Sequence, residues 1–409
     1  MVLSLRDVNI RGRKVFMRID INVPIDPRNG SILDDKRIRA HAKAVKVIVE
    51  EYNPALVLAS HQGRPGDSDF TTLEKHAELL SKYTGLDIEF IPDVIGPAAL
   101  SKIKSMKPGD IILLDNLRLL AEENIEAPPE KQTQTIFAKR IASVIDFYIN
   151  DAFSAAHRSQ PSIVGLPLLV PGVMGPTFEG EVKALNRVFS ESATPRVFVL
   201  GGKKVAELLI AIEKAVKNGV VIDRVLTGGL LAQLFLLAKG ADIGRENVKV
   251  LEKLDLLHYV HKARELLEMD VPIDVPIDLV VKTSSGYEVR EIDRIGDGVI
   301  VDIGPTTASI YEEQLKHAKT VVMRGPLGVI EDPETRKGTE KIIRAVLTHA
   351  DTIIIAGGHL TSLIGENGFD NSRVYISLGG NATMLFLAGE RLPAIEALEI
   401  SAKKFFGVR

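Results

Sequence analysis

Residues 56–65 read Leu56-Val57-Leu58-Ala59-Ser60-His61-Gln62-Gly63-Arg64-Pro65, an apolar run followed at once by a polar loop. Consecutive apolar residues bounded by turn signals are typical of a strand that is buried on both faces, as in a parallel sheet. The pattern of apolar run, turn and helical periodicity recurs along the chain. The other runs span residues 15–17, 111–114, 147–149, 197–200, 224–226, 299–301, 320–323, 352–355 and 374–377. Strands that alternate with helices predict an α/β fold in which helices cover both faces of parallel sheets, a three-layer αβα arrangement.

The chain is long enough for two such domains, because 409 residues exceed what one hydrophobic core usually holds. Between the halves, Pro176 opens a stretch with apolar residues at Val182, Leu185 and Val188, which predicts a helix. The Gly- and Pro-rich residues 165–175 before it are expected to form a connector. We therefore expect two Rossmann-like domains with parallel sheets, residues 1–175 and 191–392, joined by an interdomain helix and hinge over residues 176–190.

Composition excludes several classes of function. The chain has no cysteine, so disulfides, thiolate nucleophiles and cysteine-ligated metal sites are ruled out. A formal net charge of −3 and a pI near 6.3 argue against nucleic acid or an acidic membrane as a partner. No signal-peptide pattern opens the sequence, and proline interrupts the most apolar stretch, residues 164–173, well short of the ~20 residues of a membrane span. We expect a cytoplasmic protein.

Cationic side chains follow the predicted strands of the first half. In open parallel sheets, ligands bind beyond the carboxyl ends of the strands, and converging guanidinium groups there suit phosphate and carboxylate. The alternative is a set of surface arginines paired with nearby acids, and histidines with structural roles. The loops are Arg18-Ile19-Asp20-Ile21-Asn22, Ser60 to Pro65, Asp115-Asn116-Leu117-Arg118 and Asn150-Asp151-Ala152-Phe153 through His157-Arg158, and Arg37 begins the first long helical pattern.

Glycine-rich turns follow the predicted strands of the second half. Glycines let a ligand approach the backbone, and each helix start offers free N–H groups, so a nucleotide is the natural occupant of such an edge. Lys203 and Lys204 add positive charge where phosphates would lie. The alternative is that the glycines serve only tight packing of turns. The turns are residues 201–204, 227–229, 304–307, 325–328, 357–360 and 379–381.

Several known motifs are absent. The sequence has no G-x-x-x-x-G-K-[S/T] loop, no protein-kinase motif set, no G-x-G-x-x-G between a strand and a helix, and no G-x-S-x-G. Cations and backbone amides without a candidate nucleophile suit phosphoryl transfer, in which the protein positions the reactants and neutralises charge. We predict a phosphotransferase acting on a nucleotide and a small anionic metabolite. Another nucleotide-dependent α/β enzyme, such as a dehydrogenase or nucleotidyl transferase, and a non-catalytic nucleotide or anion sensor are the alternatives.

Five motifs together resemble the phosphoglycerate kinase family. They occur in the family's order and, with the rest of the resemblance, cover nearly the whole chain from about residue 15 to about residue 398. The S-H-x-G-R-P and N-D-A-F…H-R motifs are highly specific, and His359 is similar to the archaeal members. The five motifs are residues 18–24, 60–65, 150–158, 201–205 and 325–329.

The resemblance implies reversible transfer of the acyl phosphate of 1,3-bisphosphoglycerate to ADP, giving 3-phosphoglycerate and ATP. This reaction of glycolysis and gluconeogenesis has a carboxyl group as phosphoryl acceptor and uses Mg²⁺ bound with the nucleotide. By the same resemblance, Arg37 and Lys204 are catalytic and contact the phosphoryl group from opposite sides. The implied phosphoglycerate-binding residues are Asp20, Asn22, Arg37, His61, Arg64, Arg118, His157 and Arg158.

The resemblance also implies a nucleotide site in the second domain, where Glu331 contacts the ribose and residues 357–360 line the phosphates. Departures from the family pattern also fall here: Leu208 stands in place of a second lysine, Arg324 in place of Asn, His359 in place of Asp, and Asn381 in place of Gly. No side chain is assigned to a metal. The implied nucleotide-binding residues are Gly201, Gly202, Lys203, Lys204, Gly228, Gly229, Pro326, Gly328, Glu331, Gly357, Gly358, His359 and Leu360.

Transfer between two domains requires them to close over both ligands, which also excludes water from the acyl phosphate. We expect the hinge within residues 176–190 and a C-terminal segment, residues 393–409, that packs back towards the first domain. The expected partners are 3-phosphoglycerate or 1,3-bisphosphoglycerate and ATP or ADP, in a monomer or a dimer.

Overall fold

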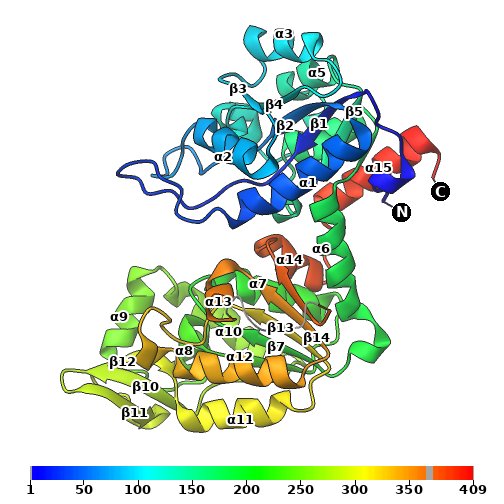
Figure 1. Cartoon of the computed structure of the whole chain (residues 1–409). Helices are drawn as coiled ribbons and strands as arrows, with labels where there is room; N and C mark the ends of the chain where they lie inside the picture. Colours follow the sequence, from blue (N-terminus) through cyan, green and yellow to red (C-terminus); the bar gives the residue numbers. More distant parts are fainter. Residues whose placement is uncertain (1, 365–371, 409) are drawn as a thin grey trace. The chain divides into compact units, whose positions relative to one another are not determined.

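The computed structural model describes residues 2–364 and 372–408, without the side chains of Glu191, His359, Thr361 and Ser362. The chain forms two compact units (Figure 1). The first unit comprises Met1–Val182 and Arg391–Arg409, and the second unit comprises Lys183–Glu390, so the boundary falls inside helix α6, Pro176–Asn186. Among the described residues, no helix combines the length and the apolar character needed to cross a membrane.

The first unit contains a six-stranded sheet of order β3-β4-β2-β1-β5-β6, in which every pairing is parallel. All five residues of β2 are buried, as the unbroken apolar run predicts. The end of β1 is level with the ends of its neighbours, because Arg18 pairs with Ala59 and with Asn150. The strands are β1 Lys14–Arg18, β2 Ala55–Ala59, β3 Glu89–Ile91, β4 Ile111–Leu114, β5 Phe147–Asn150 and β6 Gly172–Met174.

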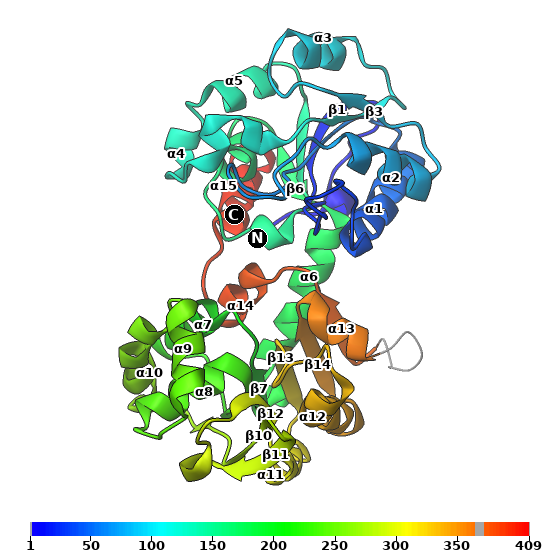
Figure 2. The same ribbon diagram turned by 90° about the vertical axis from the view of Figure 1, so that its left-hand side faces the viewer.

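Helices cover both faces of this sheet (Figure 2). Helix α1 buries an apolar stripe from Ile38 to Ile48 in the same cluster as Met17 of β1. The neighbouring Phe16 points to the opposite face, where its ring packs edge-on against Phe137 of α5 with centroids 6.1 Å apart. The helices of this unit are α1 Lys36–Tyr52, α2 Glu74–Thr84, α3 Pro97–Ser105, α4 Pro129–Gln132, α5 Ile136–Ala142 and α15 Pro393–Phe406.

The C-terminal helix α15 is part of the first unit. Its Ser401 hydroxyl accepts a hydrogen bond from the Gly172 N–H of β6 at 2.9 Å, and Ala394 donates to the Ala156 carbonyl at 3.0 Å. Helix α15 also contacts the turns Pro161–Gly165 and Leu166–Leu168. Helix α15 is therefore packed on a sheet formed by the first half of the chain.

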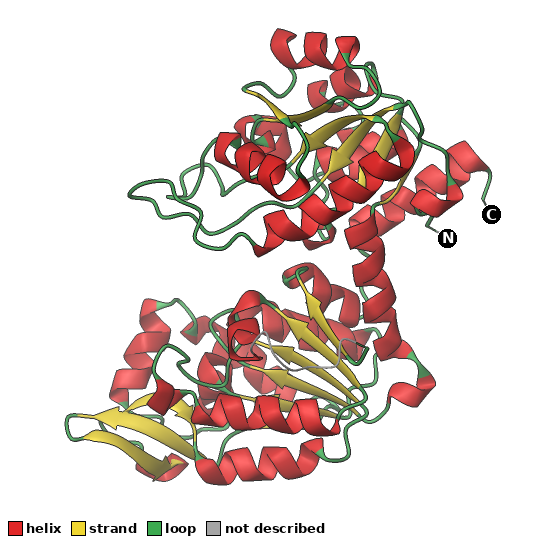
Figure 3. Cartoon of the chain, in the orientation of Figure 1, coloured by secondary structure: helices red, strands yellow, loops and turns green. Residues whose placement is uncertain are grey.

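The second unit contains another six-stranded parallel sheet, of order β15-β14-β13-β7-β8-β9, flanked by helices (Figure 3). Both sheets confirm the predicted fold class. The strands are β7 Arg196–Leu200, β8 Arg224–Thr227, β9 Ile273–Asp274, β13 Thr320–Arg324, β14 Thr352–Ala356 and β15 Val374–Ser377. The helices are α7 Val205–Lys217, α8 Gly229–Ala238, α9 Arg245–Lys253, α10 Val260–Leu267, α11 Pro305–Leu315, α12 Lys337–His349, α13 Gly358–Ile364 and α14 Asn381–Leu387.

The strand predicted at residues 299–301 exists, but its place in a parallel sheet was wrong. It is β12, Val299–Ile303, in a separate antiparallel sheet with β10, Asp278–Thr283, and β11, Gly286–Glu291. A two-residue connection makes β10 and β11 a hairpin, and β12 pairs with β10 instead of with the central strands. The connector expected at residues 165–175 was also partly wrong, because its end forms β6.

Candidate active site

The carboxyl end of β1 carries a fully buried arginine, Arg18. Its Nη2 lies 3.0 Å from Nδ1 of His61, and its Nε donates to the Ser162 hydroxyl at 3.1 Å. Ser162 in turn donates to the buried carboxylate of Glu123. Burial raises the pKa of Glu123, opposed by Arg18 and by the hydrogen bonds from Ser162. Arg18 is thus a buried cation held between two supporting groups, and it fixes the ring of His61.

His61 is a neutral imidazole with one defined tautomer. Burial lowers its pKa well below the ordinary value, and Arg18, Arg118 and Arg158 lower it further, whereas Asp20 opposes the shift. Arginine has donors only, so Nδ1 of His61 accepts the hydrogen bond from Arg18. The proton of the neutral ring therefore resides on Nε2, which makes this atom a hydrogen-bond donor.

Three arginines, Arg18, Arg64 and Arg158, lie close enough to Arg118 to affect its charge. Its pKa is lowered from the ordinary value to about 10, first because of burial and then because of the positive charges of Arg158, Arg18 and Arg64. Its Nη1 donates to the Gly63 carbonyl, which ties it to the loop after β2. Even at this pKa the group is charged near pH 7. Positive charges this close together repel one another, and a bound polyanion would relieve that repulsion.

Asp20 organises the Arg37 side of this edge. Its buried carboxylate accepts hydrogen bonds from Arg37 and from the Ser154 hydroxyl. Burial alone would raise the pKa of Asp20, but the positive charge of Arg37 and the hydrogen bond from Ser154 hold it well below the ordinary value, so the group is ionised. Arg37 keeps 30% of its side chain exposed, so the guanidinium is anchored by Asp20 and partly accessible to solvent.

The remaining expected residues have different surroundings. Asn22 accepts from the Gly63 N–H at 3.1 Å and so orients the loop after β2. Arg158 is half-buried and forms an ion pair of 3.2 Å with Glu126, which matches the alternative of an arginine paired with a nearby acid. His157 is half-buried after the short helix Phe153–Ala155, and Arg64 is exposed.

Glycine turns of the second unit fall into two groups. A Cβ atom on Gly201 would overlap the carbonyl oxygen of Pro326, and one on Gly229 would lie 2.9 Å from the Gly202 nitrogen. These turns are packed against one another, so their glycines are required by turn packing. By contrast, a Cβ on Gly357 or Gly358 would meet no heavy atom of the described residues within 4 Å, and the same is true of Gly380. Only the second group faces open space.

The helix starts of this unit also differ. Asp278 caps α11 by accepting from the N–H groups of Thr306 and Thr307 at 2.9 and 2.7 Å. Asp302 receives the Gly338 N–H of α12 at 2.7 Å, and burial raises the pKa of this carboxyl to about 7. The prediction that the glycine turn at residues 304–307 belongs to the nucleotide edge was therefore wrong. This turn follows a strand of the antiparallel sheet, and the helix start after it already binds a carboxylate. Within the part of the chain that the structure describes, no side chain caps the start of α7 or of α8.

Lys203 and Lys204 are exposed just before α7, and Lys204 Nζ lies 3.8 Å from Glu207 Oε1. Leu208 is fully buried. Glu331 is exposed, and Pro326 and Gly328 are half-buried in the turn after β13, whereas Leu360 is buried in α13. The side chain of His359 lies outside what the structure describes.

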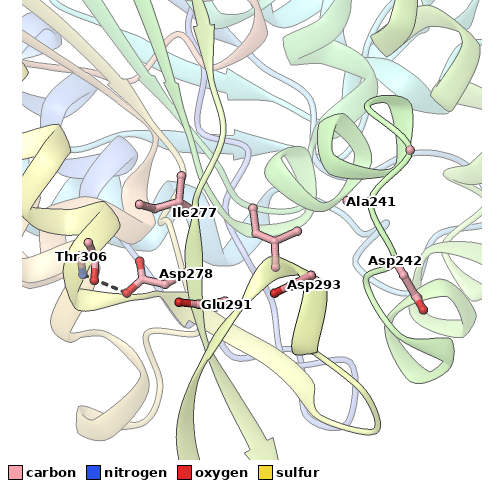
Figure 4. Close-up of a pocket in the computed structure, with 9 residues that line it drawn as sticks. Ala241, Asp242, Ile277, Asp278, Glu291, Asp293 and Thr306 are labelled. Carbon is pink, nitrogen blue, oxygen red and sulfur yellow. Dashed lines mark hydrogen bonds between the residues drawn. The ribbon is translucent and has the colours of Figure 1, made fainter.

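A pocket of about 640 Å³ lies elsewhere in the second unit, beside the start of α11 and the β11 end (Figure 4). None of the sequence-predicted site residues lines it. Acidic side chains prevail in its lining, so it would repel a nucleotide's phosphates, and one of them, Asp278, is already used as the α11 cap. The lining residues are Gly240, Ala241, Asp242, Ile277, Asp278, Glu291, Ile292, Asp293 and Thr306.

Sequence reasoning missed the supporting residues behind the arginines. Glu123 and Ser162 hold Arg18, and the buried His41 lies behind Asp20, to whose backbone N–H its Nε2 is bonded at 3.2 Å. No sequence motif identifies these residues, because their partners are far away in sequence. The one available signal was a histidine within the otherwise apolar stripe of α1.

Two α/β units, one edged with arginines and the other with lysines and open glycines, define the class as an α/β kinase, a transferase. The family model described as phosphoglycerate kinase matches residues 5–390. Curated relatives with the same name include those of Sulfurisphaera tokodaii, 47% identical over 97% of this chain and 95% of the relative, and Saccharolobus solfataricus, 48% identical over 97% of each. The crystal structure of phosphoglycerate kinase from Pyrococcus horikoshii OT3 matches with a TM-score of 0.89 and 38% identity, over 98% of this chain and all of that one.

The chain therefore belongs to the phosphoglycerate kinase family, as the resemblance predicted. Its reaction is the one of that family, phosphoryl transfer between phosphoglycerate and a nucleotide. This identification sets aside the alternatives of a dehydrogenase and a nucleotidyl transferase.

Proposed function

We propose that the arginine edge of the first unit binds 3-phosphoglycerate and 1,3-bisphosphoglycerate, and that the glycine edge of the second unit binds ADP and ATP. The convergence of Arg18, Arg64 and Arg158 on Arg118 carries the first half of this proposal, because it is a preformed field for a polyanion. The acyl phosphate passes to ADP, and in reverse the substrate carboxyl group accepts it.

In this proposal each residue at the arginine edge has a defined task. Arg64, Arg118, His157 and Arg158 bind the phosphate of phosphoglycerate, and His61 contributes its Nε2–H as a neutral donor. Asn22 and Asp20 contact the glycerate and keep the loop and Arg37 in place, as their present hydrogen bonds suggest. Bound substrate would replace Glu126 as the partner of Arg158, and this partly exposed ion pair contributes little to stability.

On the nucleotide edge, the starts of α7 and α8 and the open glycines 357 and 358 support phosphate binding. Lys203 and Lys204 supply charge, and Glu331 binds the ribose. Gly201, Gly202, Gly228, Gly229, Pro326 and Gly328 shape the turns, and His359 and Leu360 complete the assignment.

Mg²⁺ is proposed to arrive with the nucleotide. The ion is commonly held by substrate phosphates, waters and at most one or two carboxylates. Among the described residues, no three His, Asp or Glu side chains gather into a metal cage. Bound Mg²⁺ supplies positive charge to the nucleotide's phosphate oxygens, and no side chain is assigned to it.

The transfer is proposed to proceed directly and in line after closure at residues 176–190. A β-phosphate oxygen of ADP forms a bond to the acyl phosphorus while the bond to the carboxylate oxygen breaks, so the carboxylate leaves with its electron pair and no proton moves. Arg37 and Lys204 neutralise the charge that spreads over the moving phosphoryl group. Closure excludes water that would hydrolyse the acyl phosphate. The protein is proposed to act in the cytoplasm, as a monomer or a dimer.

A coupled assay tests the activity of this chain. Purified protein receives 3-phosphoglycerate and MgATP, and glyceraldehyde-phosphate dehydrogenase reports 1,3-bisphosphoglycerate through oxidation of its reduced nicotinamide cofactor. We expect oxidation that depends on both substrates and on Mg²⁺. Absence of turnover with ligand binding intact would instead support a non-catalytic sensor.

A further inference from the structure

The second unit has a buried arginine that the proposed function leaves without a role, Arg324. It ends β13, a central strand, and pairs in register with Leu200 on one side and Ala356 on the other. It therefore stands between the turn that precedes α7 and the turn that precedes α13. Its carbonyl accepts the Gly201 N–H at 2.8 Å, which joins its backbone to the first of these turns.

The Arg324 guanidinium spans two elements. Nη2 forms an ion pair of 2.5 Å with Oε2 of Glu207 in the first turn of α7, and Nη1 donates to the Gly380 carbonyl before α14. Only 6% of the Arg324 side chain is exposed. Burial lowers the pKa of Arg324, while Glu207 opposes this, so the cation depends on that carboxylate as its counter-ion.

Glu207 has a second cation within reach, Lys204. Its Oε1 lies 3.8 Å from Lys204 Nζ, and these residues are three apart on one helix face. The two contacts are unequal, because the Lys204 side chain is 67% exposed and its pair is long and screened by water. The Glu207 carboxylate is thus held mainly by the closer, buried contact with Arg324, and its contact with Lys204 is long.

We propose that Arg324 is a positioning residue for the phosphoryl transfer, acting as the counter-ion that keeps Glu207 from neutralising Lys204. This rests on the proposed function, in which Lys204 meets the moving phosphoryl group. Without the guanidinium, Glu207, whose side chain is 33% exposed, has one cation left and pairs with it. Lys204 then meets phosphate as part of a neutral pair. With Arg324 present, Lys204 contacts the carboxylate only through a long, exposed pair, so more of its charge is available to the anion.

A double-mutant cycle tests this coupling by kcat, KM for MgATP and ADP affinity by calorimetry. The variants are Arg324→Gln, Glu207→Gln and their combination. We expect Arg324→Gln to lower kcat at least tenfold, and addition of Glu207→Gln to restore it to within about threefold of wild type, since a neutral amide cannot compete for Lys204. A purely structural role for Arg324 predicts no rescue. A double variant as slow as Arg324→Gln, or Arg324→Gln within twofold of wild type, overturns the proposal.

Three further variants serve as controls for this test. Arg336→Gln removes an arginine from a 2.8 Å pair with Glu340 on α12 of the same unit and is expected to leave kcat unchanged. If Arg324→Gln fails to fold, Arg324→Lys carries the test, because it retains the counter-ion and should stay within threefold of wild type; a tenfold loss overturns the proposal. Lys204→Ala separates a failure of the proposed function from a failure of the proposal for Arg324. A wild-type kcat in that variant would refute the catalytic role of Lys204 itself.

Discussion

His41 Nδ1 lies 2.9 Å from Oδ2 of Asp151, and both side chains are buried. The other ring nitrogen of His41 accepts the Asp20 N–H, so Nδ1 is the donor to the carboxylate. The second oxygen of Asp151 accepts the N–H groups of Thr177 and Phe178 at the start of α6. One hydrogen-bonded chain therefore links α6 to Asp20, the residue that holds Arg37.

Replacement of His41 by Ala should destabilise the protein by about 3 kcal/mol, because it breaks a buried pair and leaves Asp151 with less compensation for its charge. Urea unfolding measures the change. The control is His261→Ala, which removes an exposed histidine 3.2 Å from Glu265 and should change the free energy of unfolding by less than about 0.5 kcal/mol. Equal effects of the two substitutions on the free energy of unfolding would show that the His41–Asp151 pair stabilises the fold no more than an exposed pair does.

Arg37→Ala should lower kcat by about 100-fold or more, since it removes a charge matched to the transition state. Steady-state kinetics in the coupled assay gives kcat and KM separately. Arg39→Ala is a matched control on the same helix. Arg39 lies two residues after Arg37 and forms an exposed ion pair with Asp35. If only KM changed in Arg37→Ala, the assigned role of Arg37 would be wrong.

Arg118→Met should weaken the stabilisation of the protein by 3-phosphoglycerate. Ligand that binds only the folded state raises the melting temperature, so wild type should melt several degrees higher with saturating ligand. The variant should show a much smaller shift, because it loses the guanidinium on which the other arginines converge. Arg140→Ala, which changes an exposed arginine of α5, should keep the full shift.

Asp302 should make the protein less stable as pH rises. Burial lifts its pKa from 3.8 to about 7, so between these values the folded state holds a proton that the unfolded state has lost, and the free energy of unfolding falls with pH. The full contribution is on the order of 4 kcal/mol. Asp302→Asn should flatten the decline between pH 5 and 8, measured by urea unfolding at several pH values. An unchanged slope would mean that Asp302 titrates as an ordinary carboxyl.

Two glycine substitutions should have opposite consequences. Gly201→Ala would force a Cβ into the Pro326 carbonyl and should lower the melting temperature markedly, whereas the Gly358 position is open and should tolerate Ala without loss of stability. Gly358→Ala should nevertheless weaken ADP binding, because the methyl group occupies the space proposed for phosphate. Calorimetry of unfolding and of ADP binding separates the two effects; undiminished ADP affinity in Gly358→Ala would contradict the proposed phosphate position.

Local pattern predicted most of the fold, and two kinds of failure have a physical explanation. The run at residues 56–59 is apolar at every position because both faces of β2 are covered, so its burial could be inferred directly. Strands β3, β6 and β9 have only two or three residues, too few for a periodic signal. Residues 299–303 were recognised as a strand, but their partner, β10, is chosen by the hairpin that precedes them.

The same division holds for the candidate site. Arginines at strand ends could be assigned to one edge, because parallel topology brings the carboxyl ends of strands together. The sequence could not show that Arg158 and Arg118 have different surroundings. Arg158 pairs with Glu126, whereas the pKa of Arg118 is lowered by three other arginines. The two kinds of glycine turn could not be distinguished from the sequence either. Gly201 and Gly358 each belong to a Gly-Gly pair and differ only in the atoms that lie beside them.

The sequence by itself determined the fold class, the family and which side chains stand at each sheet edge, because strand periodicity, chain order and motif identity are local properties. Only the tertiary structure decided which of these side chains are supported and how each is charged. The burial of Arg18, the neutral ring of His61 and the choice of Glu207 between Lys204 and Arg324 depend on desolvation and on charges that lie far apart along the chain. For Arg37, the structure supplied the residue that anchors it, Asp20, and the buried His41–Asp151 pair behind that residue.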